Sequence, residues 1–379
     1  MTENWVRLGA TTFVWSPGAG GAARIAGDAA DVNGLALVTQ VGRAFQDEHP
    51  DVRVLVDHGR HLVVDPAGMG PHTGGDGLCW RVEPMPVNTV VVDRPEPAAG
   101  QADGDTTVLL GQISTTSLDV DLHWLVGLGS RHSLSSGFAE AVAGSSARLT
   151  GHGYTVATPS ISVGGAASSN VVADRPGDGT GGIVLVTAHL DSINLAGGPG
   201  APAPGADDNG SGSAGLLELA RVLATRSWRH DLRLILFGGE EEGLFGSKQY
   251  VAALPAAERA RVRAVLNMDM IGTRNTAAST VLLEGAPVSR GFMDDLAAAA
   301  ATYTGLQVET SLSPFASDHV PFIDAGMPAV LTIEGADSAN SNIHSARDIL
   351  AHVDLDLLRE ILRMNLAALA RRLDAPDDA

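Results

Sequence analysis

The chain has 379 residues, and its 44 acidic against 25 basic side chains give a formal net charge of −19. With 44% apolar and 18% charged residues, the composition excludes an intrinsically disordered chain. The acidic excess argues against a nucleic-acid partner, because binding to phosphates needs a basic face.

Disulfides and membrane segments are not expected either. The single cysteine, Cys79, rules out an intramolecular disulfide framework and a cysteine-based zinc site. Residues 1–15 contain no basic region followed by an apolar stretch of signal-peptide length, and no later run approaches about 20 apolar residues. We therefore expect no membrane span; the sequence as written reads as cytoplasmic, and it leaves the compartment open.

Residues 1–117 are predicted to form a small strand-rich unit. We expect strands at residues 52–56, 61–65, 89–93 and 106–110, a hairpin at residues 58–60, and one helix over residues 35–46. Residues 94–105 are rich in Pro, Gly and Asp, as a linker or a long exposed loop would be. No residue cluster in this part indicates chemistry, so we interpret it as an accessory or pro-domain-like unit.

Residues 118–379 show the alternation of helices and apolar strands that is typical of an α/β layered domain. Helices are predicted at residues 136–151, 211–226, 292–303 and 355–373, and strands at residues 183–187, 232–237, 265–270 and 329–333. The connections that follow these strands carry most of the notable His, Asp and Glu residues. In open α/β sheets, sites lie at the carboxyl ends of strands, so these connections are the expected site.

The first two polar clusters follow the strand at residues 183–187. His189 leaves that strand, and Asp191 could accept a hydrogen bond from its second ring nitrogen, as a metal-bound imidazole requires. Residues 205–212 (GADDNGSG) then open a helix. Residues 210–215 fit the dinucleotide fingerprint G-x-G-x-x-G, but no strand precedes them and two aspartates would repel a pyrophosphate.

Three further clusters add carboxylates and imidazoles. Residues 240–242 are three adjacent glutamates after the strand at 232–237; they read either as a solvated helix start or as cation ligands. Asp269 lies in an otherwise apolar strand and needs a metal or a basic partner. His344 follows the last strand, with Asp348 placed to orient it or to pair with Arg347, and residues 317–319 (SDH) lie upstream.

Taken together, the clusters supply histidines and carboxylates but no cysteine, a donor set suited to zinc and less often to manganese or cobalt. A carboxylate that bridges two ions, each with one more His and one more carboxylate, would use the whole set. A Ser-His-Asp or Cys-based mechanism is less well supported. No G-x-S-x-G motif is present, and Cys79 belongs to the N-terminal unit, which we expect to lie far from the clusters.

The ordered motifs HLDS, GADDNGSG, EEEGLFGS, NMDMIG, SDHVPF and NIHSARD resemble those of metallopeptidase family twenty-eight, the co-catalytic zinc aminopeptidases with carboxypeptidase and glutaminyl cyclase relatives. The resemblance extends from about Leu118 to the C-terminus. It implies an α/β fold with a mixed, twisted central sheet between helices, here preceded by the small strand-rich domain. It also implies that residues 118–379 are a di-zinc peptidase domain.

The resemblance further assigns a role to each site residue. It implies that one zinc is held by His189 and Asp269, the other by Glu241 and His344, that Asp208 bridges the two, that Glu240 is the general base and that Asp191 orients His189. In the family the peptide bond after the bridging aspartate is often cis, here Asp208–Asn209. Some relatives assist the oxyanion with a tyrosine, but none of the three tyrosines of this chain occupies a matching position.

The function expected on this basis is removal of N-terminal residues from peptides that have a free N-terminus. A carboxypeptidase or a glutaminyl cyclase on the same fold is the first alternative, and the five filled ligand positions disfavour the cyclase. A non-catalytic binding domain is the second alternative. The family is often secreted although no leader is visible, and the sequence leaves the oligomeric state open, a monomer included.

Overall fold

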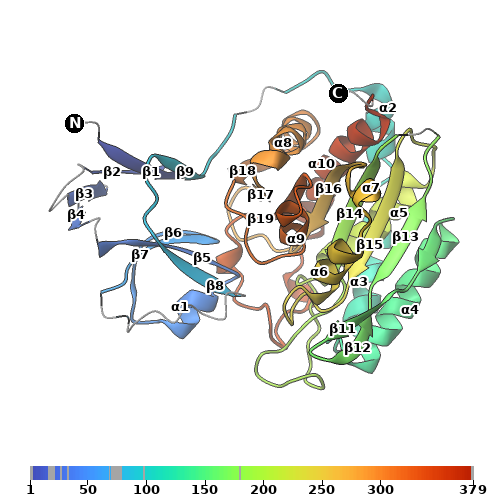
Figure 1. Ribbon diagram of the computed structural model, residues 1–379, viewed down its shortest axis with the longest axis horizontal. Helices are drawn as coiled ribbons and strands as arrows, with labels where there is room; N and C mark the ends of the chain where they lie inside the picture. Colours follow the sequence, from blue (N-terminus) through green and yellow to red (C-terminus); the bar gives the residue numbers. More distant parts are fainter. Residues whose placement is uncertain are drawn as a thin grey trace.

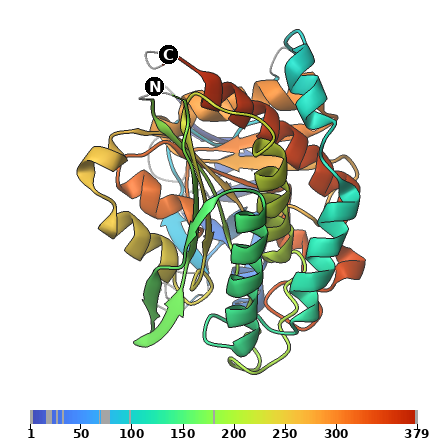
Figure 2. The ribbon, with the colours of Figure 1, turned by 90° about the vertical axis from the view of Figure 1, so that its right-hand side faces the viewer.

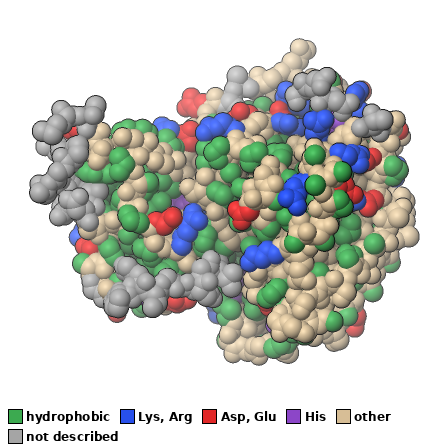
Figure 3. Space-filling model, in the orientation of Figure 1, with side chains coloured by type: hydrophobic (Ala, Val, Ile, Leu, Met, Phe, Trp, Pro, Cys, Tyr) green, Lys and Arg blue, Asp and Glu red, His purple; other side chains and the backbone are tan. Residues whose placement is uncertain are grey.

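The structure is a computed structural model that describes residues 3–15, 22–25, 28–31, 34–67, 69, 79–96, 99–178 and 181–376. A small unit made largely of strands lies beside a larger α/β unit (Figure 1). In the space-filling view the small unit is seated against one side of the large one, and acidic and basic side chains lie close together at several places on that face (Figure 3). No helix in the described part of the chain has the length and apolar character needed to cross a bilayer.

The small unit, residues 4–93, is called the strand-rich unit below. It contains a three-stranded sheet in the order β2-β1-β9, a four-stranded sheet in the order β6-β7-β5-β8, and the β3-β4 hairpin. The elements are β1 Asn4–Leu8, β2 Thr11–Trp15, β3 Ala22–Ile25, β4 Asp28–Asp31, β5 Ala36–Gln40, α1 Ala44–Glu48, β6 Arg53–His58, β7 His61–Asp65, β8 Trp80–Pro84 and β9 Thr89–Val92.

Three predicted strands of this region are confirmed, and two predicted elements are wrong. Residues 52–56, 61–65 and 89–93 coincide with β6, β7 and β9, and β6 and β7 form the expected hairpin. Residues 35–46 are instead a buried strand followed by a short helix, because the chain turns at Gly42, where φ is +49°. Residues 106–110 are helical because the Asp103 carboxylate caps a helix by accepting the Thr106 N–H.

The large unit is built on one eight-stranded sheet in the order β10-β13-β15-β14-β16-β19-β17-β18. Strands β15, β14, β16 and β19 run parallel at its centre, and β13 and β17 join this set antiparallel. The strands are β10 Thr155–Ala157, β13 Val171–Arg175, β14 Ile183–His189, β15 Asp231–Phe237, β16 Val262–Met268, β17 Thr280–Glu284, β18 Gln307–Ser311 and β19 Ala329–Glu334, with a separate hairpin of β11 Ser160–Val163 and β12 Ala166–Ser169.

Helices cover both faces of this sheet (Figure 2). One face packs against α2 Gly104–Leu110, α3 Thr115–Gly127, α4 Ser136–Gly151, α5 Gly210–Leu223, α8 Arg290–Tyr303 and α10 Leu355–Asp374, and the other against α6 Phe245–Ala253 and α9 His319–Asp324. A short helix, α7 Ala256–Arg259, follows α6. The larger apolar core lies under α5 and α10, whose buried leucines meet the inner residues of β14 and β16. The two layers of helices hold the central strands with their carboxyl ends at one edge.

All eight helices and strands predicted after residue 118 are present, with shifted ends. The strand predicted to end at Thr187 continues through His189, and the strand predicted over residues 265–270 ends at Met268. The second strand stops there because Met270 has φ +52°, which a strand cannot contain. Helix α2 belongs to the segment predicted as part of the first domain, and it packs on α10 of the large unit. The boundary near residue 117 stays a prediction.

Contacts at several places join the units. At the edge of the large sheet, Asp93 and Thr310 exchange backbone hydrogen bonds of 2.8 and 2.9 Å. At the tip of the β6–β7 hairpin, Gly59 has φ +67°, and a Cβ there would lie 2.8 Å from the Cα of Ala336. The glycine therefore serves both the turn and the close approach of the units. The next residue, Arg60, is 2% exposed and reaches into the large unit.

Candidate metal centre

Four parallel strands bring the predicted ligands to one edge of the sheet. His189 is the last residue of β14, Glu240 and Glu241 follow β15, and Asp269 follows β16 directly. His344 lies in the loop after β19. Because the carboxyl ends of neighbouring parallel strands meet, residues far apart in sequence become neighbours here.

Asp208 reaches the same place through a loop fixed from several sides. The peptide bond between Asp208 and Asn209 is cis. The Asn209 side chain caps α5 by accepting the Gly212 N–H at 2.9 Å, and its amide donates to the Met268 carbonyl at 2.9 Å. The Asp348 carboxylate accepts the N–H of Asp208 at 2.9 Å. These bonds tie the start of α5 to the end of β16 and hold the Asp208 carboxylate in place.

The two oxygens of Asp208 face two different histidines. Its Oδ1 lies 3.3 Å from His189 Nε2, and its Oδ2 lies 3.1 Å from His344 Nε2. Each histidine has a further carboxylate of its own. Asp269 Oδ1 lies 3.2 Å from His189 Nε2, and Glu241 Oε2 lies 3.1 Å from His344 Nε2. The arrangement is a central carboxylate between two His–carboxylate pairs.

The electrostatics of this cluster call for added positive charge. Although burial opposes their charged forms, the surrounding carboxylates raise the pKa of His189 and of His344 well above the usual value. Burial and the charge of Asp208 raise the pKa of Glu241 to about 7. The protons on the imidazoles thus act as counterions, and since a ligating imidazole must be neutral, a bound metal ion would take their place.

The donor set and its free atoms fit a divalent cation. Ligand atoms of His189, Asp208 and Glu241 lie within 4.8 Å of one another, and so do those of His189, Glu240 and Asp269. Glu241 Oε1 is buried and has no hydrogen-bond partner among the described residues. Imidazole nitrogens and carboxylate oxygens without thiolate are the ligands of catalytic zinc sites.

The family of the chain follows from residues 170–369. This segment, more than half of the 379 residues, matches the model of Peptidase family M28. The chain belongs to this family. The matched segment contains each of the residues that meet in the cluster, from His189 to His344.

Curated relatives in the M28 family match over part of their length. Leupeptin-inactivating enzyme 1 of Streptomyces exfoliatus is 33% identical over 214 residues, which are 55% of this chain and 45% of that protein. Aminopeptidase YwaD of Bacillus subtilis is 34% identical over 181 residues, 47% of this chain and 38% of that protein. The chain spans less than half of the length of these two relatives.

Solved structures match the fold over more of the chain. The aminopeptidase from Aneurinibacillus sp. strain AM-1 has a TM-score of 0.61 at 18% identity and covers 72% of this chain and 97% of that chain. The LapA aminopeptidase of Legionella pneumophila has a TM-score of 0.64 at 17% identity and covers 90% and 98%. At this level of identity the likeness shows a shared fold, and it confirms the predicted mixed sheet flanked by helices.

Asp191 and Glu240, which are predicted to assist the metal ligands, also lie at the cluster. Asp191 Oδ1 lies 3.6 Å from His189 Nδ1, and its Oδ2 accepts the Glu241 N–H at 3.2 Å. Glu240 lines an open cavity together with Glu241 and His344. Burial and the charges of neighbouring carboxylates raise the pKa of Glu240 well above its usual value. The roles of these two residues stay predictions.

Two expectations about the surroundings of the cluster are wrong. Asp348 neither orients His344 nor pairs with Arg347: its carboxylate accepts the N–H groups of Asp207 and Asp208, and the Arg347 guanidinium donates to the Ser341 carbonyl. Cys79 is not remote from the site. Strand β8 lies over the cavity, and Cys79 lines it together with Glu240 and Glu241.

Several supporting residues were missed by sequence reasoning. The fully buried Arg131 donates to the carbonyls of Leu190 at 2.9 Å and Gly205 at 2.8 Å, and so joins the loops that carry His189 and Asp208. The Ser317 hydroxyl donates to Asp269 Oδ2 at 2.7 Å. Only the SDH motif signalled Ser317. Nothing in the sequence could mark Arg131, because its partners are backbone carbonyls.

Backbone strain and tyrosine positions complete the description. His344 has φ +53°, and Met270, the residue that follows Asp269, has φ +52°. Both lie in the left-handed region, which costs non-glycine residues energy and is common at functional sites. The tyrosine hydroxyls are engaged elsewhere: Tyr154 donates to the Ala220 carbonyl, Tyr250 accepts from Arg233, and Tyr303 accepts the Asp103 N–H.

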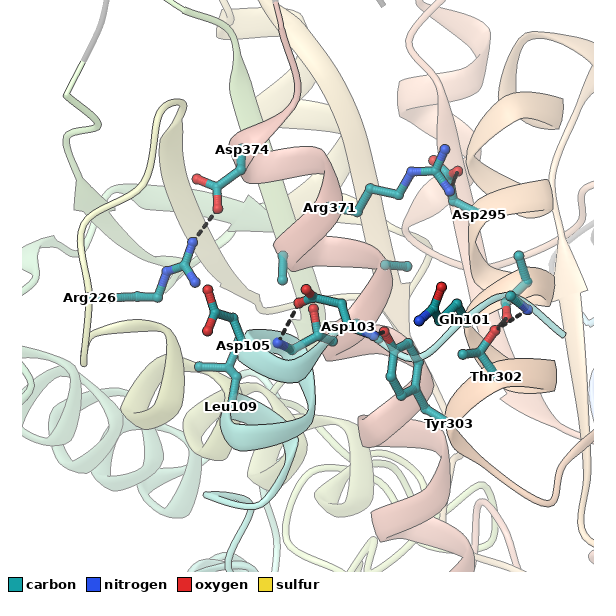
Figure 4. Close-up of a pocket in the computed structure, with 17 residues that line it drawn as sticks. Gln101, Asp103, Asp105, Leu109, Arg226, Asp295, Thr302, Tyr303, Arg371 and Asp374 are labelled. Carbon is teal, nitrogen blue, oxygen red and sulfur yellow. Dashed lines mark hydrogen bonds and ion pairs between the residues drawn. The ribbon is translucent and has the colours of Figure 1, made fainter.

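A second hollow of about 410 Å³ lies between α2, α8 and α10, away from the cluster (Figure 4). Four of its charged side chains are paired with one another. Arg226 pairs with Asp374, and Arg371 Nη1 lies 3.2 Å from Asp295 Oδ1 (Figure 4). Because these charges are satisfied within the protein, we interpret the hollow as part of the packing of α2.

Proposed function

We propose that this M28 protein is a metallo-aminopeptidase with two zinc ions, which cleaves the N-terminal peptide bond of peptides. The observation that carries the proposal is the central Asp208 carboxylate, whose two oxygens face His189 and His344, each beside a carboxylate of its own. One ion would be held by His189 and Asp269, the other by Glu241 and His344, and Asp208 would bridge them.

Bound zinc supplies Lewis acidity, which lowers the pKa of water toward neutrality and polarises a carbonyl group. The chain's own residues do the remaining work. Glu240 faces the cavity, takes a proton from the attacking water, and returns it to the leaving amine. Asp191 holds the His189 ring from behind, and Asp348 holds the loop of Asp208.

Cleavage at a free N-terminus is supported by the charge of the site. The cavity of about 440 Å³ opens onto Glu240 and Glu241, and carboxylates in excess of the metal charge attract the ammonium group of a free peptide N-terminus. The name of one relative described above, an aminopeptidase of Bacillus subtilis, agrees with this reaction.

Glu240→Gln tests the mechanism. The amide keeps the shape of the side chain but cannot accept a proton, so hydrolysis of leucine p-nitroanilide should be abolished while the zinc content, measured on the purified protein, stays near two ions per chain. Glu140→Gln, on the exposed face of α4, is the matched control and should behave like wild type. A fully active Glu240→Gln protein would contradict the proposed role of Glu240 as the general base.

Blocked substrates test the direction of cleavage. An N-acetylated dipeptide lacks the ammonium group, so an aminopeptidase should leave it intact and cleave its free-amine counterpart. Cleavage of the acetylated peptide at its carboxyl end would instead assign the carboxypeptidase reaction. Protein that binds no zinc, and gains no activity when zinc is added, would point to a binding domain.

A further inference from the structure

The cavity beside the candidate metal centre, called the metal cluster below, has walls from both units. The large unit contributes Glu240, Glu241 and His344, and the strand-rich unit contributes Val41, Cys79 and Arg81. Most of the remaining lining is apolar, formed by Leu195, Leu244, Pro314, Phe315 and Val320. The strand-rich unit therefore forms part of the surface that a substrate meets.

Arg81 is the charged side chain that the strand-rich unit presents to this cavity. It lies on β8, and its guanidinium carbon is 5.0 Å from the centroid of the Phe315 ring. Its Nε lies 3.2 Å from Glu83 Oε2, at side-chain exposures of 34% and 52%. A single, partly exposed pair of this kind contributes little, so a substrate carboxylate can compete for the guanidinium. Among the described residues, Arg81 has no other carboxylate within ion-pair distance.

The platform under Arg81 is fixed by the contact between the units. The Phe315 N–H donates to Glu284 Oε1 at 2.8 Å, and the Phe315 carbonyl accepts from the Arg60 guanidinium. Arg60 is itself 2% exposed and lies 3.1 Å from Glu284 Oε2. An arginine stacked on a held ring loses little side-chain freedom on binding, so its charge is already positioned for a ligand.

The walls of the cavity carry charges of both signs. Carboxylates gather beside the metal cluster, and Arg81 lies in the wall from the strand-rich unit. Lys248 adds a second cation on the exposed face of α6, where its ammonium donates to the Gly243 carbonyl at 3.0 Å. Asp324, also at the cavity, is exposed on α9 and faces solvent. A short peptide has a matching pattern, an ammonium group at one end and a carboxylate at the other.

We propose that Arg81 is a substrate-binding residue that pairs with a carboxylate of the peptide, so that the strand-rich unit determines specificity. The proposal rests on the peptidase function proposed above. The carboxylate could be the C-terminus of a short peptide or an acidic side chain at the N-terminal residue. Both present the planar pair of oxygens that a guanidinium recognises.

Two substrate pairs separate these sources. Leu-Ala against Leu-Ala-amide tests the C-terminal carboxylate, and glutamate p-nitroanilide against glutamine p-nitroanilide tests the acidic side chain. In Arg81→Gln, the ratio of kcat/KM for the carboxylate substrate to that for its amide partner should fall about tenfold or more in one pair, mainly through KM. Arg81→Lys keeps the positive charge but lacks the planar guanidinium. It should therefore retain part of the preference for the carboxylate substrate over its amide partner.

Arg53→Gln is the control, because it removes the same charge from an exposed position on β6 of the same unit. It should leave both ratios unchanged. An equal loss on carboxylate and amide substrates in Arg81→Gln would make Arg81 a structural residue, and unchanged ratios would remove it from substrate binding; either result overturns the proposal. Wild-type protein that hydrolyses none of these substrates would instead contradict the proposed peptidase function.

Discussion

Two buried clusters of charge, one inside the large unit and one where the strand-rich unit meets it, are balanced in opposite ways. The first, the metal cluster, gathers six carboxylates around two imidazoles: Asp191, Asp208, Glu240, Glu241, Asp269 and Asp318 around His189 and His344. The second, the Arg60 cluster, consists of Glu284, Asp337 and His319 around the guanidinium of Arg60. The metal cluster has more carboxylates than cationic side chains, whereas the Arg60 cluster contains a cation of its own.

The difference shows which cluster is built for a ligand. Arg60 lowers the pKa of Glu284 to about 2 against the effect of burial, so this carboxylate stays charged within the protein. In the metal cluster, burial and neighbouring acids raise the pKa of Glu241 to about 7 and that of Asp318 to about 7. Buried carboxylates in excess are costly without a cation, so the metal cluster, and not the Arg60 cluster, is a place for metal ions.

The largest expected effect comes from removing the central carboxylate of the metal cluster. Asp208→Asn takes away the charge shared by the two His–carboxylate pairs, so both zinc sites should weaken together. We expect activity to fall well beyond the roughly 10- to 100-fold caused by changing a residue that only supports a ligand. Zinc content by atomic spectroscopy and kcat/KM are measured side by side.

Asp119→Asn, at an exposed position on α3, is the charge control for that experiment. It should retain full zinc content and activity. An Asp208→Asn protein that still binds two zinc ions and turns over normally would contradict the bridging role.

The next effect is the loss of the cation in the Arg60 cluster. Arg60→Met keeps an apolar stem but leaves Glu284 and Asp337 buried without their arginine cation, so the free energy of unfolding should fall by about 3–5 kcal/mol. Urea unfolding of the zinc-loaded protein measures it. Adding Glu284→Gln to Arg60→Met should recover part of the loss. If the single change costs less than about 1 kcal/mol, the cluster does not depend on Arg60.

A smaller effect concerns pH and Asp337. Burial raises the pKa of this carboxyl from its usual 3.8 to about 6. A folded-state pKa above the unfolded value disfavours the fold at neutral pH, and this cost is relieved as the pH falls through 6 toward 3.8. Compared with Asp337→Asn under the same metal conditions, wild type should therefore gain up to about 3 kcal/mol between pH 7 and pH 4. A pH-independent difference between the two proteins would exclude the raised pKa.

The sequence predicted the structure where the polar motifs follow directly after recognisable apolar strands. The apolar runs predicted β14, β15, β16 and β19 because buried parallel strands are nearly continuous in apolar residues. The motifs after these strands predicted which side chains would meet, since parallel strands end at one edge. The strand pattern indicated only this edge; that His189 and His344, 155 positions apart, belong to one metal centre was implied by the family resemblance.

The sequence was insufficient where long-range contacts or local capping decided the outcome. Residues 106–110 carry β-branched side chains, yet the Asp103 cap makes them helical. Arg60 and Arg81 belong to a region without a visible motif, and their partners Glu284 and Phe315 lie more than 200 residues further along the chain. No local pattern can register such a contact, so the share of the strand-rich unit in the cavity was not predicted.

The smallest expected effect tests whether the distance between two charges or their burial sets the strength of an ion pair. Arg7 and Asp93 approach to 2.6 Å, closer than Arg60 and Glu284 at 3.1 Å, but their side chains are 40% and 44% exposed. Water screens such a pair and holds its charges well when they separate, so Arg7→Gln should change the free energy of unfolding by less than about 1 kcal/mol. Urea unfolding of this variant beside Arg60→Met gives the test. A cost for Arg7→Gln equal to that of Arg60→Met would mean that contact distance, and not desolvation, sets the strength of the ion pairs in this protein.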